Sequence, residues 1–415
     1  MNLLKEQKKL KSFFSEVRNL TEAIVEPLSA EDMQVQTMAD VSPTKWHLAH
    51  TTWFFETFLL KEYLPDYKEF NSHYNYLFNS YYNAVGNRHL REERGCLSRP
   101  CLEEVMNYRS YVDEAMQSLI DQQNVEIDSL IIIGLNHEQQ HQELILTDIK
   151  HVLGTNPLRP AYSKGLKQVA SEESTPLNWN YYPGGIFHMG HNYNSVINDF
   201  AFDNESPRHQ VYVIPFQLAS RLVSNQEYQE FIDDGAYQNP EWWLSDAWNW
   251  ICRESITAPL YWFKEDGLWS RYGLGGLERL QANQPVSHVS FYEADAYARW
   301  AGARLAAETE WEFAASQSKI EGNFLEDGYL EPNTNNSLFG NLWQWTASPY
   351  IAYPGYKADP GALGEYNGKF MVNQMVLRGG SCLSSKSHLR SSYRNFFYPT
   401  ARWQASGIRL AKDGY

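Results

Sequence analysis

Hydrophobic residues recur at helical spacing through the first part of the chain. The stretch 2–25 has apolar positions three or four residues apart, and three later stretches follow the same period. They cover residues 42–64, 98–123 and 126–153. We expect the second helix to begin with Ser42 as its N-cap and Pro43 in its first turn, and the third to open in the same way at Ser98. Four helices of about 20 residues predict an antiparallel four-helix bundle.

The pattern changes after the fourth predicted helix. Residues 156–178 are polar and without a period, which indicates a linker. From residue 179 onward, short strand-like runs alternate with glycine-rich turns and many tryptophans. Strands are expected at 184–190, 209–219 and 375–381, and short helices at 224–235, 290–302 and 306–316. The predicted fold is multidomain, α plus α+β, with a helical bundle over 1–155 and a second domain with long loops over 179–415.

Composition narrows the function classes. The net charge of −15 argues against binding to nucleic acid or to an anionic membrane surface. No run of 18 apolar residues predicts a membrane span, and the lysine-bearing start has no apolar core of a signal peptide. The four cysteines are too scattered for a disulfide framework, so a cytoplasmic location is expected.

Candidate metal ligands stand in the fourth predicted helix, "NHEQQHQELILTDIKH". His137 and His141 lie four residues apart and share one helix face, which is a common two-ligand arrangement. The fragment "HEQQH" also matches the H-E-x-x-H pattern of metalloproteases, which keeps that class open. His151 lies ten residues beyond His141, or about 15 Å along the helix axis, and is too far away to share an ion.

A third ligand is expected from the second helix, where "KWHLAHTTWFFE" carries His47 and His50. Either histidine, together with His137 and His141, would complete a three-histidine site between facing helices. A structural role for each is the competing interpretation. Three imidazoles leave open positions on an ion, which suits a redox metal that binds substrate and O2 together, although zinc fits the ligand type as well.

Several further motifs give the chain a family resemblance. They are "PGGIFHMG", "NESPRHQVYVIPFQLASRLVSNQEYQEF", "QPVSHVSFYEADAYARWAGARLAAETEWEFAA", "GNLWQWTAS", "LRGGS" and "GIRLA". With the "LAH" histidine and the "HEQQH" helix, the chain resembles the ergothioneine-biosynthesis sulfoxide synthases. Members of that family join a DinB-type bundle to a formylglycine-generating-enzyme-like domain with a C-type-lectin-like fold. They are non-haem iron enzymes that use O2 to attach a thiol sulfur to the imidazole C2 of hercynine (Nα-trimethylhistidine).

The resemblance implies roles for particular residues. His50, His137 and His141 match the family's Fe(II) ligands, whereas His47 does not, and Gln140 matches a glutamine that contacts the substrate imidazole. The long connection 65–97 holds "NSYYNAVG", which is similar to one branch of the family whose tyrosine pair serves O2 activation. That similarity points to Tyr81 and Tyr82, since a phenol can donate a proton or hydrogen atom there.

The segment "SSYRNFFYPTARW" implies the substrate contacts. Asn395 would orient the amino-acid end of hercynine, and Phe396 and Phe397 would offer ring faces to its trimethylammonium group. Another branch of the family carries an acidic residue where Phe397 stands, which holds the amino group of γ-glutamylcysteine. The departure favours free cysteine as the thiol donor. Its carboxylate could be held by Arg88, Arg91 or Arg94, for which a solvated basic loop is the competing interpretation.

Alternatives remain at this stage. A selenoneine synthase, with a selenosugar donor, has the same architecture. A 5-histidylcysteine sulfoxide synthase fits less well, because that type usually carries a methyltransferase domain. From another class, the chain could be a noncatalytic metal- or ligand-binding module. The formylglycine-generating activity itself is not expected, because Cys382 in "RGGSC" has no second cysteine after it.

Overall fold

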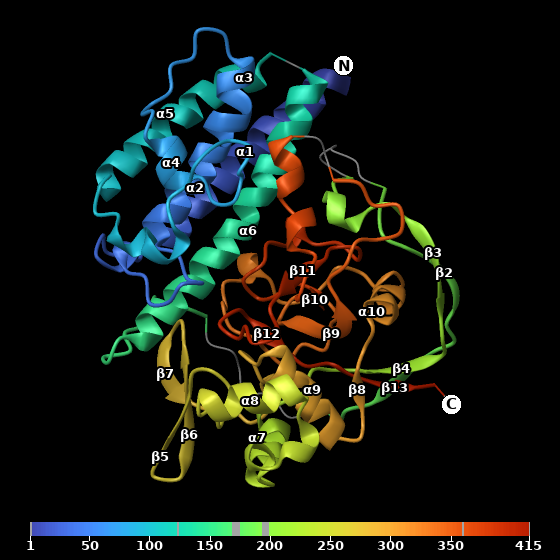
Figure 1. Ribbon diagram of the computed structural model, residues 1–415. Coiled ribbons are helices and arrows are strands. Elements are labelled where there is room, and N and C mark those ends of the chain that lie inside the picture. The colour runs from blue at the N-terminus through green and yellow to red at the C-terminus, as the bar shows by residue number, and fades with distance from the viewer. Residues whose placement is uncertain (1, 123, 168–174, 193–198, 359–360, 415) are drawn as a thin grey trace. The chain divides into compact units, whose positions relative to one another are not determined.

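The computed structural model describes residues 2–122, 124–167, 175–192, 199–358 and 361–414 (Figure 1). By their contacts the residues form two compact units that are not simple consecutive halves of the chain. The helical unit takes in Met1–Pro157 and two later segments, Tyr193–Asp203 and Lys357–Lys369. The strand-rich unit takes in Leu158–Asn192, Asn204–Tyr356 and Phe370–Tyr415. No helix in the described part of the chain combines the length and the apolarity that crossing a bilayer requires.

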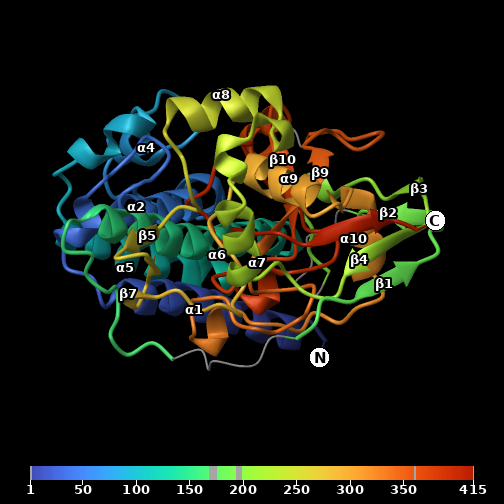
Figure 2. The ribbon, with the colours of Figure 1, turned by 90° about the horizontal axis from the view of Figure 1, so that it is seen from below.

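The helical unit is a bundle whose main helices are seen in both views (Figures 1 and 2). Helix α2 contacts α5 and α6, and α1 also contacts both of these. The bounds are α1 Asn2–Val25, α2 Thr44–Phe55, α3 Lys61–Tyr63, α4 Tyr74–Phe78, α5 Leu102–Ile120 and α6 Val125–Thr155. A π-helical turn, Glu56–Leu60, joins α2 to α3. The four predicted helices are therefore confirmed, with shifted ends.

Two of the predicted helix starts are wrong. Helix α2 begins at Thr44, and the N-cap position is Pro43, not Ser42. The Ser42 backbone N–H instead donates to Asp148 at 2.9 Å, and its hydroxyl accepts from Arg94. Helix α5 begins at Leu102, beyond the predicted Ser98, and the Cys101 backbone N–H at its N-cap donates to Glu104. The contacts of Ser42 are with distant residues, which the local sequence does not reveal, whereas the Cys101–Glu104 contact at α5 is local.

The described part of the strand-rich unit contains two four-stranded sheets, a hairpin and a three-stranded meander. The first sheet has the order β1-β4-β13-β8 and the second β11-β10-β9-β12, and β2 pairs with β3 while β6 lies between β5 and β7. The bounds are β1 Trp179–Tyr182, β2 Gly185–Met189, β3 His209–Val213, β4 Phe216–Ala219, β5 Trp262–Glu265, β6 Leu268–Gly273, β7 Gly276–Arg279, β8 Arg304–Leu305, β9 Trp343–Pro349, β10 Met375–Arg378, β11 Asn395–Phe397, β12 Ser406–Gly407 and β13 Leu410–Asp413.

Short helices accompany these sheets: α7 Asn225–Asp233, α8 Ser245–Arg253, α9 Phe291–Trp300 and α10 Glu308–Ala315. Helices α7 and α9 each start with a capping box, in which a serine N-cap and a glutamate three residues later bond reciprocally. The predicted strand 209–219 is two strands, β3 and β4, because Pro215 between them has no N–H for a ladder. A buried cluster of Val213, Phe216, Leu218, Ala306, Ala314 and Ala411 forms part of the core.

The predicted domain boundaries stay a prediction, and the contact-based units differ from them in one important respect. Residues 357–369 follow the predicted start of the second domain, yet they cluster with the bundle. Part of the predicted linker packs on the strand-rich unit, where Tyr162 N donates to the Leu274 carbonyl at 2.9 Å. Residues 168–174 of that linker lie outside the described residues.

Candidate metal centre

Helices α2 and α6 carry the four histidines in question. Every residue of α2 is buried, which is the behaviour of a helix that is covered on all sides. His47 and His50 therefore project into the protein and not into solvent. His137 and His141 lie on α6, which packs against α2, and both rings are buried.

Three of these rings converge. One ring nitrogen each from His50, His137 and His141 lies within 4.8 Å of the others. The Nε2 atoms of His50 and His137 are 3.2 Å apart. Two nitrogens that share a metal ion at roughly 2.1 Å each lie about 3 to 3.5 Å apart, so this spacing fits a common ion.

The protonation states also fit a metal. Burial lowers the pKa of His137 to about 3. Burial, followed by the neighbouring histidines, lowers the pKa values of His50 and His141 well below the usual range. All three imidazoles are therefore neutral near pH 7, which is the form that binds a metal ion.

Hydrogen bonds orient two of the three rings. The Nδ1–H of His50 donates to the Phe78 carbonyl at 2.6 Å, which leaves its Nε2 lone pair for the centre of the group. The Nδ1 of His141 lies 2.8 Å from the Nδ1 of His47, whose Nε2 lies 3.0 Å from Asp148. His47 thus belongs to the hydrogen-bonded surroundings of the group and not to the group itself.

Indole rings cover His50. Trp46 stacks on the His50 ring at a centroid distance of 4.6 Å, and Trp53 lies nearly parallel to it at 5.5 Å. The Arg94 guanidinium sits 3.4 Å from the centroid of Trp46. The buried His50 ring is thus packed against two indole rings.

Tyr81 and Tyr82 lie one aromatic ring away from the histidines. Tyr82 packs against Trp53 and Phe54, and these rings contact His50 and His137 respectively. The Tyr81 and Tyr82 ring centroids are 4.7 Å apart. Burial raises the pKa of both phenols, so both are protonated at neutral pH.

A tyrosine that the sequence analysis missed lies against the group. The half-buried Tyr366 ring is 5.6 Å from His137 and 6.1 Å from Tyr81 between centroids. Tyr366 belongs to the late segment that clusters with the helical unit. Nothing in the local sequence "GEYNGKF" marks it, because only the fold brings this segment to the bundle.

The same segment makes hydrogen bonds to residues 81–84 of the connection 65–97, which we call the tyrosine loop. The two Glu365 oxygens accept hydrogen bonds from the backbone N–H groups of Asn83 and Ala84, at 3.0 and 2.7 Å. Lys369 donates to Glu365 at 2.7 Å and also to the Tyr81 carbonyl. We call these contacts, made by Glu365 and Lys369, the loop clamp.

The three loop arginines differ in their surroundings. Arg94 is buried, whereas Arg88 and Arg91 are exposed, and Arg91 donates to the Asp40 carbonyl at 2.6 Å. Burial, and after it the charges of Arg91 and Arg88, lower the pKa of Arg94 well below its usual range. The positive charges of Arg88 and Arg91 therefore act on the buried guanidinium of Arg94.

The remaining predicted contacts are in two places. Gln140 is half-buried on α6, between the two histidines of that helix. Asn395, Phe396 and Phe397 form β11 in the strand-rich unit. There Phe396 stacks on Tyr350 at 4.0 Å, and Phe397 meets Trp403 edge to face.

Glu138 does not occupy the position that a metalloprotease base requires. Its carboxylate receives bonds from Arg18 at 2.8 Å and from Arg109 and Thr21 at 2.7 Å. Burial opposes ionisation, but Arg109 and Arg18 lower the pKa of Glu138 to about 2. The group is a fixed, buried anion that ties α6 to α1 and α5, so the protease interpretation of "HEQQH" is wrong.

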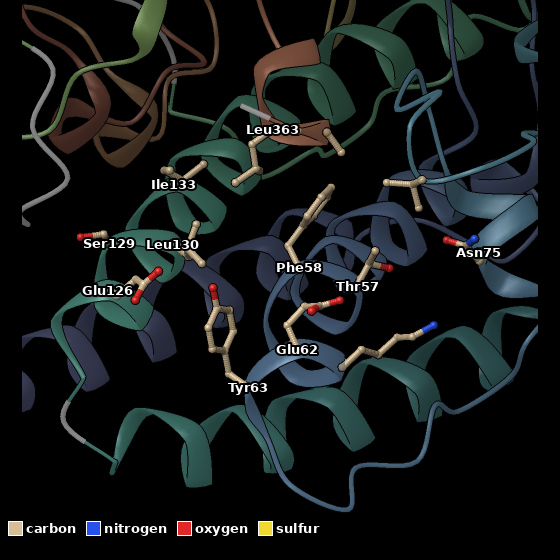
Figure 3. A pocket seen from close by; sticks show the side chains of 14 residues that line it. Thr57, Phe58, Glu62, Tyr63, Asn75, Glu126, Ser129, Leu130, Ile133 and Leu363 are labelled. Atoms are coloured by element: carbon tan, nitrogen blue, oxygen red, sulfur yellow. The ribbon is translucent and has the colours of Figure 1, made fainter. Parts of the chain in front are cut away.

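A cavity of about 880 Å³ opens in the helical unit (Figure 3). Phe58 of the π-helical turn, Leu130 and Ile133 of α6 and Leu363 of the late segment line it. Ile133 and Leu363 also line a smaller, apolar hollow of about 20 Å³ beside Phe54 and Tyr366, the two rings that contact His137. Apolar side chains thus separate the larger cavity from the surroundings of the histidine group.

Comparisons with known proteins agree with this architecture. Residues 14–145 match the DinB superfamily, and residues 169–339 and 335–414 match the sulfatase-modifying factor enzyme 1-like domain. The chain is similar to a hercynine oxygenase of Mycolicibacterium smegmatis, with 32% identity over 67% of this chain and 70% of that protein. A hercynine oxygenase of Mycobacterium tuberculosis is 31% identical over 74% of this chain and 76% of its own length. A formylglycine-generating enzyme of Streptomyces coelicolor is 28% identical over 56% and 88%.

Proposed function

Because this chain belongs to the hercynine oxygenase family and is an oxidoreductase, we propose that it is an Fe(II)-dependent sulfoxide synthase. It would join the thiol of cysteine to the imidazole C2 of hercynine, with O2 as the oxidant. The observation that carries the proposal is the buried group of three neutral imidazoles, His50, His137 and His141. Family membership also removes the support for a noncatalytic binding module.

The proposed reaction balances. The C2–H bond of hercynine and the S–H bond of cysteine break, a C–S bond forms, and sulfur takes up one oxygen atom. The two hydrogens leave with the second oxygen atom as water. C–S bond formation and sulfur oxidation each release two electrons, and together they reduce one O2. A bound Fe(II) would supply the redox chemistry that O2 reduction needs.

The chain's own residues bind, orient and handle protons. Gln140 lies beside His141 on α6, and its amide can hydrogen-bond a substrate imidazole near the metal face. Tyr81 and Tyr82 are the proposed proton donors. Their raised pKa values support this role, because a phenol that stays protonated can deliver its proton when negative charge develops on oxygen.

The proposed donor site uses charge. Arg88, Arg91 and Arg94 form a cluster of positive charge that suits a carboxylate. Phe397 offers no carboxylate to the amino group of γ-glutamylcysteine, which supports cysteine as the donor. For Asn395 and Phe396 the family resemblance is the support, and Phe396 already stacks on Tyr350.

The test uses the full chain loaded anaerobically with Fe(II). Hercynine, cysteine and then air are added, and O2 uptake and product mass are followed. The expected mass is the sum of the two substrates plus one oxygen atom and minus two hydrogens. His137→Ala should lose iron and activity together, whereas His151→Ala, on the same helix, should keep both. No O2 uptake with any thiol donor would rule the proposal out.

Replacing the substrates tests the finer assignments. γ-Glutamylcysteine or a selenosugar in place of cysteine would reveal a different donor. Histidine in place of hercynine would reveal a different acceptor. Phe397→Asp should raise turnover with γ-glutamylcysteine relative to cysteine. An unchanged ratio would show that this residue does not determine the donor.

A further inference from the structure

Three buried side chains form a continuous hydrogen-bonded row that leads away from the histidine group. The Nδ1 of His141 lies 2.8 Å from the Nδ1 of His47. The Nε2 of His47 lies 3.0 Å from Asp148 Oδ2. His47 comes from α2, while His141 and Asp148 come from α6, so the row crosses between two helices of the bundle.

The hydrogen bonds of Asp148, at the end of the row away from His141, indicate which nitrogen of each ring carries a hydrogen. Asp148 Oδ2 accepts the backbone N–H of Ser42 at 2.9 Å, and a main-chain N–H can only donate. A carboxylate oxygen accepts from His47 as well, which places a hydrogen on the His47 Nε2. In the imidazole tautomer with its hydrogen on Nε2, the His47 Nδ1 is an acceptor. It can receive only an N–H from the Nδ1 of His141.

The consequence falls on the other nitrogen of His141. With its hydrogen on Nδ1, the His141 Nε2 has a lone pair and can bind a metal. We propose that His47 and Asp148 are positioning residues that hold His141 in its metal-binding tautomer and orientation. This inference rests on the proposed function, in which His141 is a ligand of iron.

The other two rings are held differently. His50 donates directly to the backbone carbonyl of Phe78, so no substitution of a side chain removes this acceptor. Among the residues described, the Nδ1 of His137 has no hydrogen-bond partner. Within the described residues, His141 is thus the ring of the three that other side chains orient through hydrogen bonds. Outer-sphere partners of this kind typically change metal affinity by about 10–100-fold when they are removed.

Four variants isolate the row. His47→Phe keeps a ring of similar size and removes both nitrogens. Asp148→Leu removes the acceptor. Asp148→Asn is the conservative change, because the Ser42 N–H holds the amide oxygen in the same place to accept from His47. His151→Phe is the matched control, since His151 is bonded to Thr37 farther along the same helix.

The first measurement is the dissociation constant for Fe(II), under anaerobic conditions, of each purified variant. His47→Phe and Asp148→Leu should bind Fe(II) about 10–100-fold more weakly than the wild type. Asp148→Asn and His151→Phe should stay within a few-fold of it. Thermal unfolding of the apo forms shows whether each variant is folded.

The second measurement reads the tautomer itself. In the Co(II)-substituted protein, a ligand imidazole N–H gives a shifted proton resonance that disappears in D2O when it exchanges. The His141 Nδ1–H should be protected from exchange in the wild type and in Asp148→Asn. It should exchange rapidly in His47→Phe and Asp148→Leu.

The outcomes separate the two proposals. If the wild type binds Fe(II) and His47→Phe matches it in both affinity and N–H protection, the positioning role is wrong and the proposed function stands. If the wild type binds neither Fe(II) nor Co(II), the metal site itself is wrong. Should His47→Phe fail to fold, the difference between Asp148→Leu and Asp148→Asn decides the question.

Discussion

The Tyr366 ring meets the His137 ring edge to face, with centroids 5.6 Å apart and planes at 81°. Edge-to-face is one of the two favoured geometries for aromatic rings, and such a pair contributes about 0.5–1.5 kcal/mol beyond simple burial. Through Tyr366, a segment far along the chain limits how the His137 ring can turn.

The first prediction concerns this packing. Tyr366→Phe keeps the ring, so its Fe(II) affinity should stay within about twofold of the wild type. Tyr366→Leu loses the ring contact and should bind Fe(II) about 2–10-fold more weakly, in line with the energy of one aromatic pair. Anaerobic Fe(II) titration measures both. Equal weakening in the two variants would assign the effect to the hydroxyl and not to the ring.

The loop clamp gives the second prediction. Glu365→Ala removes the acceptor of two backbone N–H groups, at Asn83 and Ala84. Hydrogen bonds to a charged group contribute about 1.5–3 kcal/mol when well formed, and solvent reduces that value here. Amide exchange in residues 79–86 should therefore become roughly tenfold faster, and product formation should fall while Fe(II) affinity is unchanged.

A matched control exists for that experiment. Glu326 likewise accepts a backbone N–H, that of Lys386 in the strand-rich unit. Glu326→Ala should leave the exchange of residues 79–86 as it is in the wild type. Unchanged exchange in Glu365→Ala would mean that the clamp does not order the tyrosine loop.

The third prediction concerns Glu138. Its buried carboxylate is shared by Arg18 and Arg109. Glu138→Gln leaves these buried guanidiniums without their common anion, which should lower the free energy of unfolding by roughly 3–5 kcal/mol. Asp121→Asn, which breaks the exposed pair with Lys11, should cost no more than about 1 kcal/mol. Denaturant unfolding compares them, and equal losses would contradict the buried role.

The fourth prediction is a pH dependence from His388 in the strand-rich unit. Burial, and after it Arg390, lowers the pKa of His388 well below 6.5. The unfolded chain therefore binds a proton near pH 6 that the folded protein does not. The stabilising contribution is full above pH 6.5 and is lost as the pH falls, by up to about 1.4 kcal/mol per pH unit.

Replacing the ring tests this dependence. His388→Gln should have a shallower loss of stability between pH 7 and pH 5 than the wild type, as measured by the unfolding midpoint at each pH. The exposed His73→Gln serves as the control and should retain the wild-type slope. A His388→Gln curve that is parallel to the wild type would show that His388 does not govern this range.

Hydrophobic periodicity in the sequence predicted the long helices. Features that depend on contacts with distant residues, such as helix caps, could not be predicted from it. The apolar spacing predicted α1 and α6, and the shared face placed His137 and His141 together. The cap at Ser42 was wrong because Asp148 and Arg94 take up its amide and its hydroxyl. His47 lies three residues from His50, so spacing alone cannot distinguish a ligand from its support.

Tyr366 escaped prediction for a related reason. Its neighbours in the sequence carry no helical or strand period, and its partners His137 and Tyr81 lie far upstream. Only the tertiary structure brings them together. The family resemblance supplied the candidate ligands, while the supporting contacts of His47, Asp148 and Glu365 required the structure.

The helical unit is made of segments that are far apart in the chain, and this has a consequence for folding during protein synthesis. Residues 357–369 complete this unit, yet the ribosome makes them after most of the strand-rich unit. Domains commonly fold one after another as they emerge, with the N-terminal domain first. Here the bundle can emerge early, but its tyrosine loop gains Glu365 and Lys369, and His137 gains Tyr366, only after residues 204–356 of the strand-rich unit have been made. Assembly of the region around the histidines is therefore postponed until most of the strand-rich unit has been made.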